Sequence, residues 1–374
     1  MDFGAVECSR GMYAYCFVFF LLIFLLFFSK YNSKRLFTSF STLNKIMFCL
    51  ILAYVITSFY NGDFWHYKLY VIEDYQFYKP SEPIYDIIKT ICFNNYLLFR
   101  IVIWGSALLI LTQTLKKYKL NINMSLYFFF CMYISVFDYG RVSLAMAIYF
   151  LGFTYLFNSS TKSVLVKVLG IILMILSSTF HHSLYTLIIL SPLVLLPLNK
   201  KSFVMSLLVC PFLIVFLKDI ILDISTNGLF GISVIADKVT NYSEYEVEEK
   251  SLLERLRYIW LYSTFYLPFI ISTFKILFTN TNQDKVHAPE IIKLYRLSFY
   301  MIYLTTMILF LGFENQVLFY RNLFMLMIPL TILISYLRQN NFISSKTFSM
   351  LILLGVGYSI FRHSKVLLRF SPIH

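Results

Sequence analysis

Three basic side chains stand where chemistry at a membrane surface could take place. Arg141 opens one long apolar run, and the pair His181 and His182 separates two later runs. Two apolar crossings lie between Arg141 and the histidine pair, so the spacing predicts that all three return to the same side of a membrane. A guanidinium matches the geometry of a phosphate, and an imidazole titrates near neutral pH. Together these groups could bind a phosphate and accept the proton of a hydroxyl group.

Each of these residues also has a structural interpretation that stays open. Arg141 could be an interfacial arginine whose side chain extends to water, as is common at span ends. The histidine pair could simply form a loop. Asp138 stands three residues before Arg141, on the same predicted side as His181 and His182. We therefore take Arg141 and His181 as catalytic candidates, and His182 and Asp138 as substrate-binding candidates.

Two further arginines lie just inside predicted span ends. Arg321 has Glu314 in the turn before it, and Arg100 lies near the start of an earlier span. Ionisable groups at this depth are costly and often functional. Arg321 is a third catalytic candidate, and Glu314 and Arg100 are binding candidates. The alternative for Glu314 and Arg321 is a structural ion pair.

The segment 61–93 contributes Asp63, His66 and Asp74 as candidates for placing a substrate. Most acids in such a segment are solvated, but one could orient a base. The chain has six His and six Cys, and the Cys show no CxxC or CxxH spacing. No P-loop, GxSxG or HExxH motif is present. We expect no metal, no cofactor and no nucleotide site.

The elements that must position these residues are membrane spans. The chain of 374 residues is 59% hydrophobic and 14% charged, and its mean hydropathy is +0.72. This composition predicts an all-α, polytopic helical membrane protein, with residues 1–374 forming a single integral membrane domain. About 12 spans, counted at roughly 20 apolar residues each, are predicted near 12–29, 44–60, 94–113, 122–137, 142–158, 163–180, 183–199, 203–222, 258–278, 296–312, 318–337 and 347–361. We interpret the first run as a retained span, because no small-residue cleavage site follows it.

Charge at the span ends predicts the orientation. The net charge of +13 comes from Lys and Arg that cluster beside apolar runs, which indicates topology and argues against nucleic acid as a partner. Alternate loops share this bias, so we expect them to face the cytoplasm. The outer side then holds the turns around Arg141 and His181 and two longer segments, 61–93 and 223–257, which we expect to carry substrate-binding elements. Residues 241–257 within the second segment have the pattern of an amphipathic surface helix.

Several short motifs occur in a fixed order along the chain. Segment 61–93 contains G-D-F-W-H-Y, then E-D-Y-x-F-Y, then E-P-I-Y-D. Arg141 opens a span, Phe180 and His181 precede Ser183 in an F-H-x-S turn, and Arg321 precedes late aromatic residues. In these features, over roughly residues 50–335, the chain resembles bacterial polysaccharide polymerases of the EpsG/Wzy type. It departs from their Arg-Gln pair, because Val142 follows Arg141.

The resemblance implies a function and a set of partners. Such proteins join oligosaccharide repeat units carried on undecaprenyl pyrophosphate, at the outer face of the cytoplasmic membrane, in a GT-C-like architecture. Donor and acceptor would both be lipid-linked oligosaccharides among the membrane lipids, and a chain-length regulator and a flippase would be further partners. Arg141 and Arg321 would then bind the donor pyrophosphate, and His181 would accept the proton of the acceptor hydroxyl. One of Asp63, His66 or Asp74 would help place the acceptor.

Three other functions stay open on the sequence. A membrane acyltransferase that modifies a polysaccharide also uses membrane His and Arg, although no early acyltransferase His motif is present. A transporter or flippase of lipid-linked sugars would favour paired halves and helices broken by Gly or Pro. A ligase that moves finished glycan to another acceptor would use nearly the same chemistry.

Overall fold

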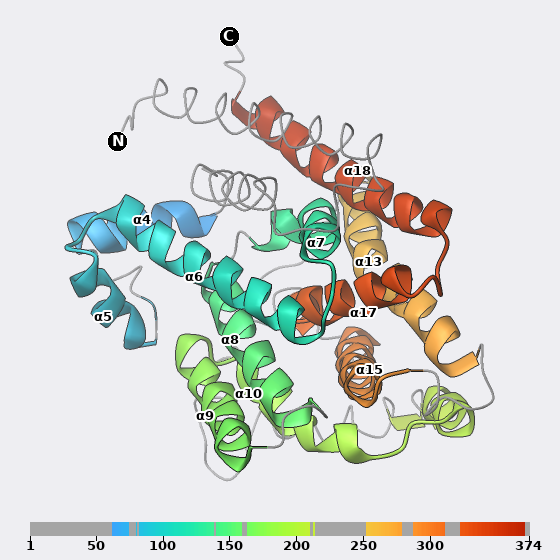
Figure 1. Ribbon diagram of the computed structural model, residues 1–374. Helices are drawn as coiled ribbons and strands as arrows, with labels where there is room; N and C mark the ends of the chain where they lie inside the picture. The colour runs from blue at the N-terminus through green and yellow to red at the C-terminus, as the bar shows by residue number, and fades with distance from the viewer. Residues whose placement is uncertain are drawn as a thin grey trace. The chain divides into compact units, whose positions relative to one another are not determined.

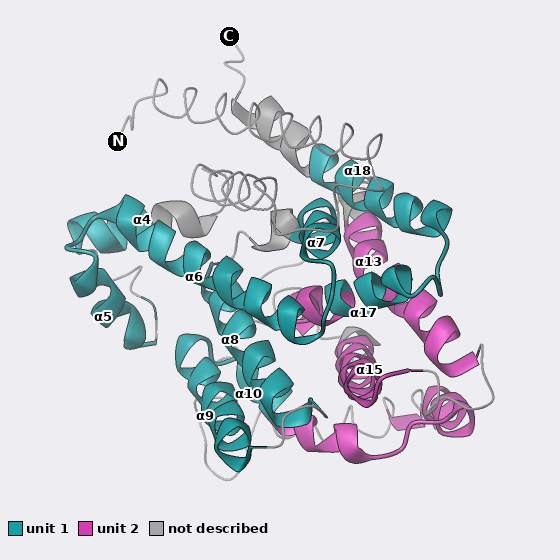
Figure 2. Cartoon of the chain, in the orientation of Figure 1, with its two compact units in different colours: residues 1–188, 331–374 teal, residues 189–330 magenta. Residues whose placement is uncertain are grey.

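The computed structural model describes most of the chain from Gly62 onward as helices (Figure 1). The described residues are 62–74, 80, 82–137, 140–158, 163–209, 212–213, 252–278, 287–310 and 322–370. They contain no strand. The chain divides into two compact units, residues 1–188 with 331–374 and residues 189–330 (Figure 2).

The first unit holds the helices that position the candidate site. Its elements are α4 (Gly62–Glu73), α5 (Ile84–Ile91), α6 (Tyr96–Lys117), α7 (Ile122–Phe137), α8 (Gly140–Phe157), α9 (Val164–Phe180), most of α10 (Leu184–Leu190), most of α17 (Met327–Gln339) and α18 (Ser345–Phe370). The second unit contains the 3-10 helix η2 (Ser191–Leu195), a helix at 200–209, α13 (Leu252–Thr273), the π-helical turn η3 (Phe274–Phe278) and α15 (Pro289–Phe310).

The predicted fold class is confirmed. Among the described residues, four helices are long and apolar enough to cross a membrane: Tyr96–Lys117, Gly140–Phe157, Tyr258–Phe278 and Asn322–Gln339. Four shorter apolar helices accompany them. The protein is therefore a polytopic helical membrane protein. The first two predicted spans and most of the one at 203–222 lie outside the described residues, so the count of about 12 stays a prediction.

Three predicted segments differ from the structure. The expected outer loop 61–93 contains two helices, because α5 has one face that buries Tyr85 and Ile88 and another that is exposed. The expected single span at 183–199 is α10 followed by η2, because Pro192 lacks an N–H and crowds the preceding turn. The expected surface helix 241–257 is described only from Leu252 onward. There it is the start of α13, which continues without a break past residue 257.

Helices α8 and α9 pack closely where two glycines meet. A Cβ on Gly152 would lie 2.6 Å from the Gly170 carbonyl oxygen, and one on Gly170 would lie 2.7 Å from that of Gly152. Only hydrogen at both positions allows the two backbones this approach, as in other membrane helix pairs with small residues at the crossing. The outward face of α9 is apolar and exposed, with Leu165 81% exposed, as expected of a surface that contacts lipid.

The first unit has a basic end, which we define by the termini of α6, α8 and α17. There, Asn158 Nδ2 donates to the Lys117 carbonyl oxygen (3.3 Å), and Gln339 Nε2 donates to that of Lys119 (3.1 Å). Helix α8 has 18 residues and rises about 27 Å at about 1.5 Å per residue. Its first residues, Gly140 and Arg141, therefore lie at the opposite end of this unit.

Candidate functional site

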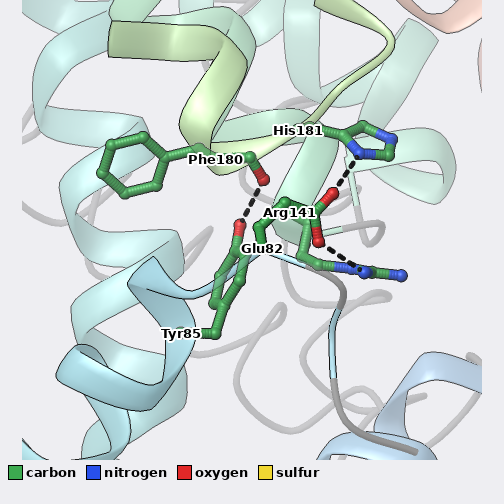
Figure 3. Close-up of polar contacts among 5 residues, drawn as sticks. All are labelled: Glu82, Tyr85, Arg141, Phe180 and His181. Atoms are coloured by element: carbon green, nitrogen blue, oxygen red, sulfur yellow. Dashed lines mark hydrogen bonds and ion pairs between the residues drawn. The ribbon is translucent and has the colours of Figure 1, made fainter.

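A buried glutamate joins Arg141 to His181 at the end of the first unit opposite the basic end. Nη1 of Arg141 donates to Oε2 of Glu82 over 3.0 Å, and Nδ1 of His181 lies 3.1 Å from Oε1 (Figure 3). The Glu82 side chain is 2% exposed and that of His181 is 8% exposed, whereas that of Arg141 is 24% exposed. The carboxylate thus bridges a cation that water can reach and an imidazole that is largely shielded from it.

The charges of this site fix the roles of the ring nitrogens. Burial alone would raise the pKa of Glu82, but the hydrogen bond with His181 and the charge of Arg141 outweigh it and lower the pKa to about 2. Glu82 is therefore ionised at neutral pH, and a carboxylate can only accept hydrogen bonds. Nδ1 of His181 must then carry the proton and donate it. In the neutral ring this leaves Nε2 as the basic nitrogen.

The three side chains come from separate elements whose ends meet. Glu82 stands just before α5, Arg141 is the second residue of α8, and His181 ends α9 in an extended conformation (φ −162°, ψ 119°). Gly140 allows α8 to start against α6, since a Cβ there would lie 2.5 Å from the Trp104 ring. The Arg141 guanidinium also lies 5.7 Å from the centre of the buried Tyr67 ring, within the range of a cation–π interaction.

Helix α5 is fixed to its neighbours by polar contacts. The Tyr85 hydroxyl donates to the Phe180 carbonyl oxygen over 3.0 Å. The Tyr70 hydroxyl donates to the Asp86 carboxylate; burial, followed by this bond, raises the pKa of Tyr70, so the hydroxyl stays protonated. These contacts hold the segment that carries Glu82 against α4 and α9.

The other predicted site residues make contacts with different partners or are not described. Arg100 is buried, with its guanidinium 4.5 Å from the centre of the Trp104 ring, and it donates to the Tyr96 hydroxyl over 3.2 Å. The His182 ring lies parallel to that of Tyr185. Asp74 is largely exposed and pairs with Lys89.

The structure does not describe the side chains of five predicted site residues. Two of them, Asp63 and His66, belong to α4, but their side chains are not among those described, and the remaining three lie outside the described residues: Asp138, Glu314 and Arg321. Among the side chains that are described, no three of His, Cys, Asp or Glu gather to hold a metal ion.

Glu82 is a residue that the sequence interpretation did not select. It begins the E-P-I-Y-D motif, so the motif was recognised while its acid was passed over. The sequence feature that could have identified Glu82 is its place between Pro80 and Pro83, because both prolines restrict the backbone of this segment. The expectation that Arg141 and His181 lie on one side agrees with their shared contact to Glu82.

A comparison with known protein families finds one match that covers most of the chain. The family model described as the EpsG family matches residues 43–367. This range includes Glu82, Arg141 and His181. No curated protein and no solved structure matches the chain.

Proposed function

Because the chain belongs to the EpsG family, which implies a function of the polysaccharide polymerase type, we propose that it is a membrane glycosyltransferase. Its substrates in this proposal are oligosaccharide repeat units linked to undecaprenyl pyrophosphate. The growing chain passes from its lipid carrier to the terminal sugar of a new lipid-linked unit. The reaction takes place at the outer face of the cytoplasmic membrane.

The observation that carries the proposal is the Glu82 bridge between Arg141 and His181. In glycosyl transfer, a hydroxyl oxygen of the acceptor sugar attacks the anomeric carbon of the donor sugar. The bond from that carbon to the pyrophosphate oxygen breaks, and the pyrophosphate leaves with the electron pair. The reaction therefore needs a base for the hydroxyl proton and a cation for the leaving group. His181 and Arg141 supply one each, within reach of the same carboxylate.

His181 acts as the base in this mechanism. The Glu82 carboxylate accepts a hydrogen bond from Nδ1–H, which selects the tautomer with a basic Nε2 and stabilises the imidazolium that forms when Nε2 takes the hydroxyl proton. Glu82 is ionised and buried, so it orients the ring without competing for the acceptor proton.

Arg141 binds the leaving pyrophosphate in this mechanism. A guanidinium has five N–H donors, and one contact to Glu82 sets its direction. Its charge stabilises the charge that develops on the departing oxygen. Arg321 is proposed as a second cation for the pyrophosphate. Asp63 and His66 are proposed to help place the acceptor, while Asp74 would have to exchange its contact with Lys89 to do so.

The test is the glycan profile of a deletion strain complemented with single variants. We expect Arg141→Ala and His181→Ala each to abolish the polymer ladder at normal protein level, since loss of a charge-stabilising donor costs about 10²–10³-fold and loss of a general base about 10²–10⁴-fold. Arg338→Ala, at the basic end, is the matched control and should keep the ladder. Normal long-chain polymer in both site variants would refute the proposal.

The same strains separate the rival functions. A polymerase defect leaves single lipid-linked repeat units on the outer side of the membrane, whereas a flippase defect leaves them on the inner side. Full-length polymer that lacks acyl substituents would point to an acyltransferase. Polymer that forms but stays on its lipid carrier would point to a ligase.

A further inference from the structure

We propose that Tyr85 is a positioning residue for His181, an inference that rests on the proposed role of His181 as the base. The segment that leads into helix α5 contacts the end of α9 through two residues that are three positions apart. Glu82 contacts the imidazole of His181, and the Tyr85 hydroxyl donates to the carbonyl oxygen of Phe180, the residue before it (Figure 3). One short segment thus holds both the side chain and the backbone at this position.

The backbone contact controls the position of His181 through the peptide plane. The Phe180 carbonyl and the His181 N–H belong to one peptide unit, which is planar. Tyr85 holds the carbonyl side of this unit, and the His181 N–H donates to the Ser177 carbonyl oxygen over 3.2 Å. With both sides held, the plane of this peptide and the position of the His181 Cα are fixed, and the contact with Glu82 then directs the ring.

The position needs such support because the helix ends there. The last carbonyls of a helix have no partner within the helix, and the chain turns to an extended conformation at His181. Tyr85 is fully buried, and its ring meets that of Phe180 edge-on at 6.5 Å. The hydroxyl therefore approaches the carbonyl from a ring that is itself held in place. An error of about 1 Å in a reacting group can cost roughly a hundredfold in rate.

The chain offers a matched control for the loss of one tyrosine hydroxyl. Tyr149 on α8 is also fully buried in the first unit, and its hydroxyl also donates to a backbone carbonyl, that of Leu187, over 3.1 Å. Tyr85→Phe and Tyr149→Phe each remove one oxygen and one similar hydrogen bond. Only the first change lies next to His181.

The experiment compares the two variants in the full chain, purified in lipid nanodiscs. Thermal unfolding, and kcat and KM with lipid-linked repeat units, are measured for each. We expect similar small losses of thermal stability, a roughly tenfold or greater fall in kcat for Tyr85→Phe with little change in KM, and kcat within about twofold of wild type for Tyr149→Phe. Equal kcat in both variants, or a fall that only follows the loss of folded protein, would overturn the inference.

A second measurement needs no substrate and separates this inference from the proposed function. The ¹⁵N signals of the His181 ring, assigned by their loss in His181→Ala, report the proton on Nδ1. We expect Tyr85→Phe to shift these signals and Tyr149→Phe to leave them in place. If wild type failed to join the repeat units but the signals still moved in Tyr85→Phe alone, the proposed function would fall and the positioning role would stand. Unmoved signals in Tyr85→Phe would refute the positioning role.

Discussion

At the scale of residues, the site depends on one carboxylate shared by two partners of different kinds. Glu82 gives one oxygen to a permanent cation and the other to a titratable ring. A buried charge of this kind is tolerated only when its partners and hydrogen bonds compensate for the lost hydration. Removing any one of the three side chains changes the environment of the other two. The effects of single substitutions on activity should therefore not be additive.

The lowered pKa of Glu82 predicts a pH dependence of stability. The pKa falls from 4.5 to about 2 in the folded protein, so the stabilisation is fully present above about pH 4.5 and is lost as the pH falls toward 2. Glu82→Gln should lower the melting temperature by roughly 5 °C at pH 7, because it leaves Arg141 and His181 without their shared charge. The gap between wild type and variant should shrink as the pH is lowered from 4.5 to 3.

Thermal unfolding in detergent across this pH range checks the prediction. Glu73→Gln, an equivalent change at an exposed position at the end of α4, serves as the control and should leave the melting temperature within about 1 °C of wild type, as is usual for a surface substitution. A gap that stays constant from pH 7 to pH 3 would show that the charge of Glu82 does not stabilise the fold.

At the scale of elements, the membrane spans could be predicted from the sequence, but the short helix between them could not. A long apolar run such as the one in α8 can cross a bilayer only as a helix. The predicted limits of this span therefore agree with the helix in the structure within a few residues. Helix α5 has only eight residues and mixed polarity, so no length rule identifies it. Glu82 was missed for the same reason: its importance comes from contacts with residues 59 and 99 positions away, which no local pattern encodes.

The crossing of α8 and α9 carries a prediction of its own. Gly170→Leu would place a side chain where only 2.7 Å separates a Cβ from the Gly152 carbonyl oxygen, so the helices must move apart. Because Arg141 and His181 are carried by these two helices, we expect a loss of about 1–3 kcal/mol in stability together with a loss of polymer.

Unfolding curves and glycan gels of the same variant check this expectation. Ile172→Leu changes the exposed, lipid-facing side of α9 and should alter neither property. A Gly170→Leu protein with wild-type stability and a full ladder would mean that the close crossing is not needed.

At the scale of the molecule, the first unit has two chemically different ends. The basic end gathers Lys117, Lys119 and Gln339, and the other end carries the Glu82 bridge. Positive charge beside spans marks the cytoplasmic side, so this separation supports the proposed outer location of the site. The structure brings together the segment before α5 and the helix ends that carry Arg141 and His181. The sequence pattern assigns all three to the same side of the membrane.

The orientation can be tested with cysteines placed at the two ends. In a chain whose six native cysteines are replaced, Glu73→Cys and Asn340→Cys introduce thiols at exposed positions. We expect a membrane-impermeant maleimide to label Glu73→Cys in intact cells, and Asn340→Cys only after the cells are permeabilised. The reverse pattern would place the Glu82 bridge on the cytoplasmic side.

The wide sequence separation within the bridge also has a consequence for biosynthesis. His181 is made 99 residues after Glu82. At about 5–20 residues per second, the ribosome needs roughly 5–20 s to supply it. Arg141 is made 59 residues after Glu82, so the acid first lacks both partners and then lacks His181. A carboxylate without its partners is stable at low energetic cost only in water. Glu82 lies just before α5, in a segment between spans. The nascent chain can therefore keep Glu82 at the membrane surface until α8 and α9 have been inserted and can enclose it.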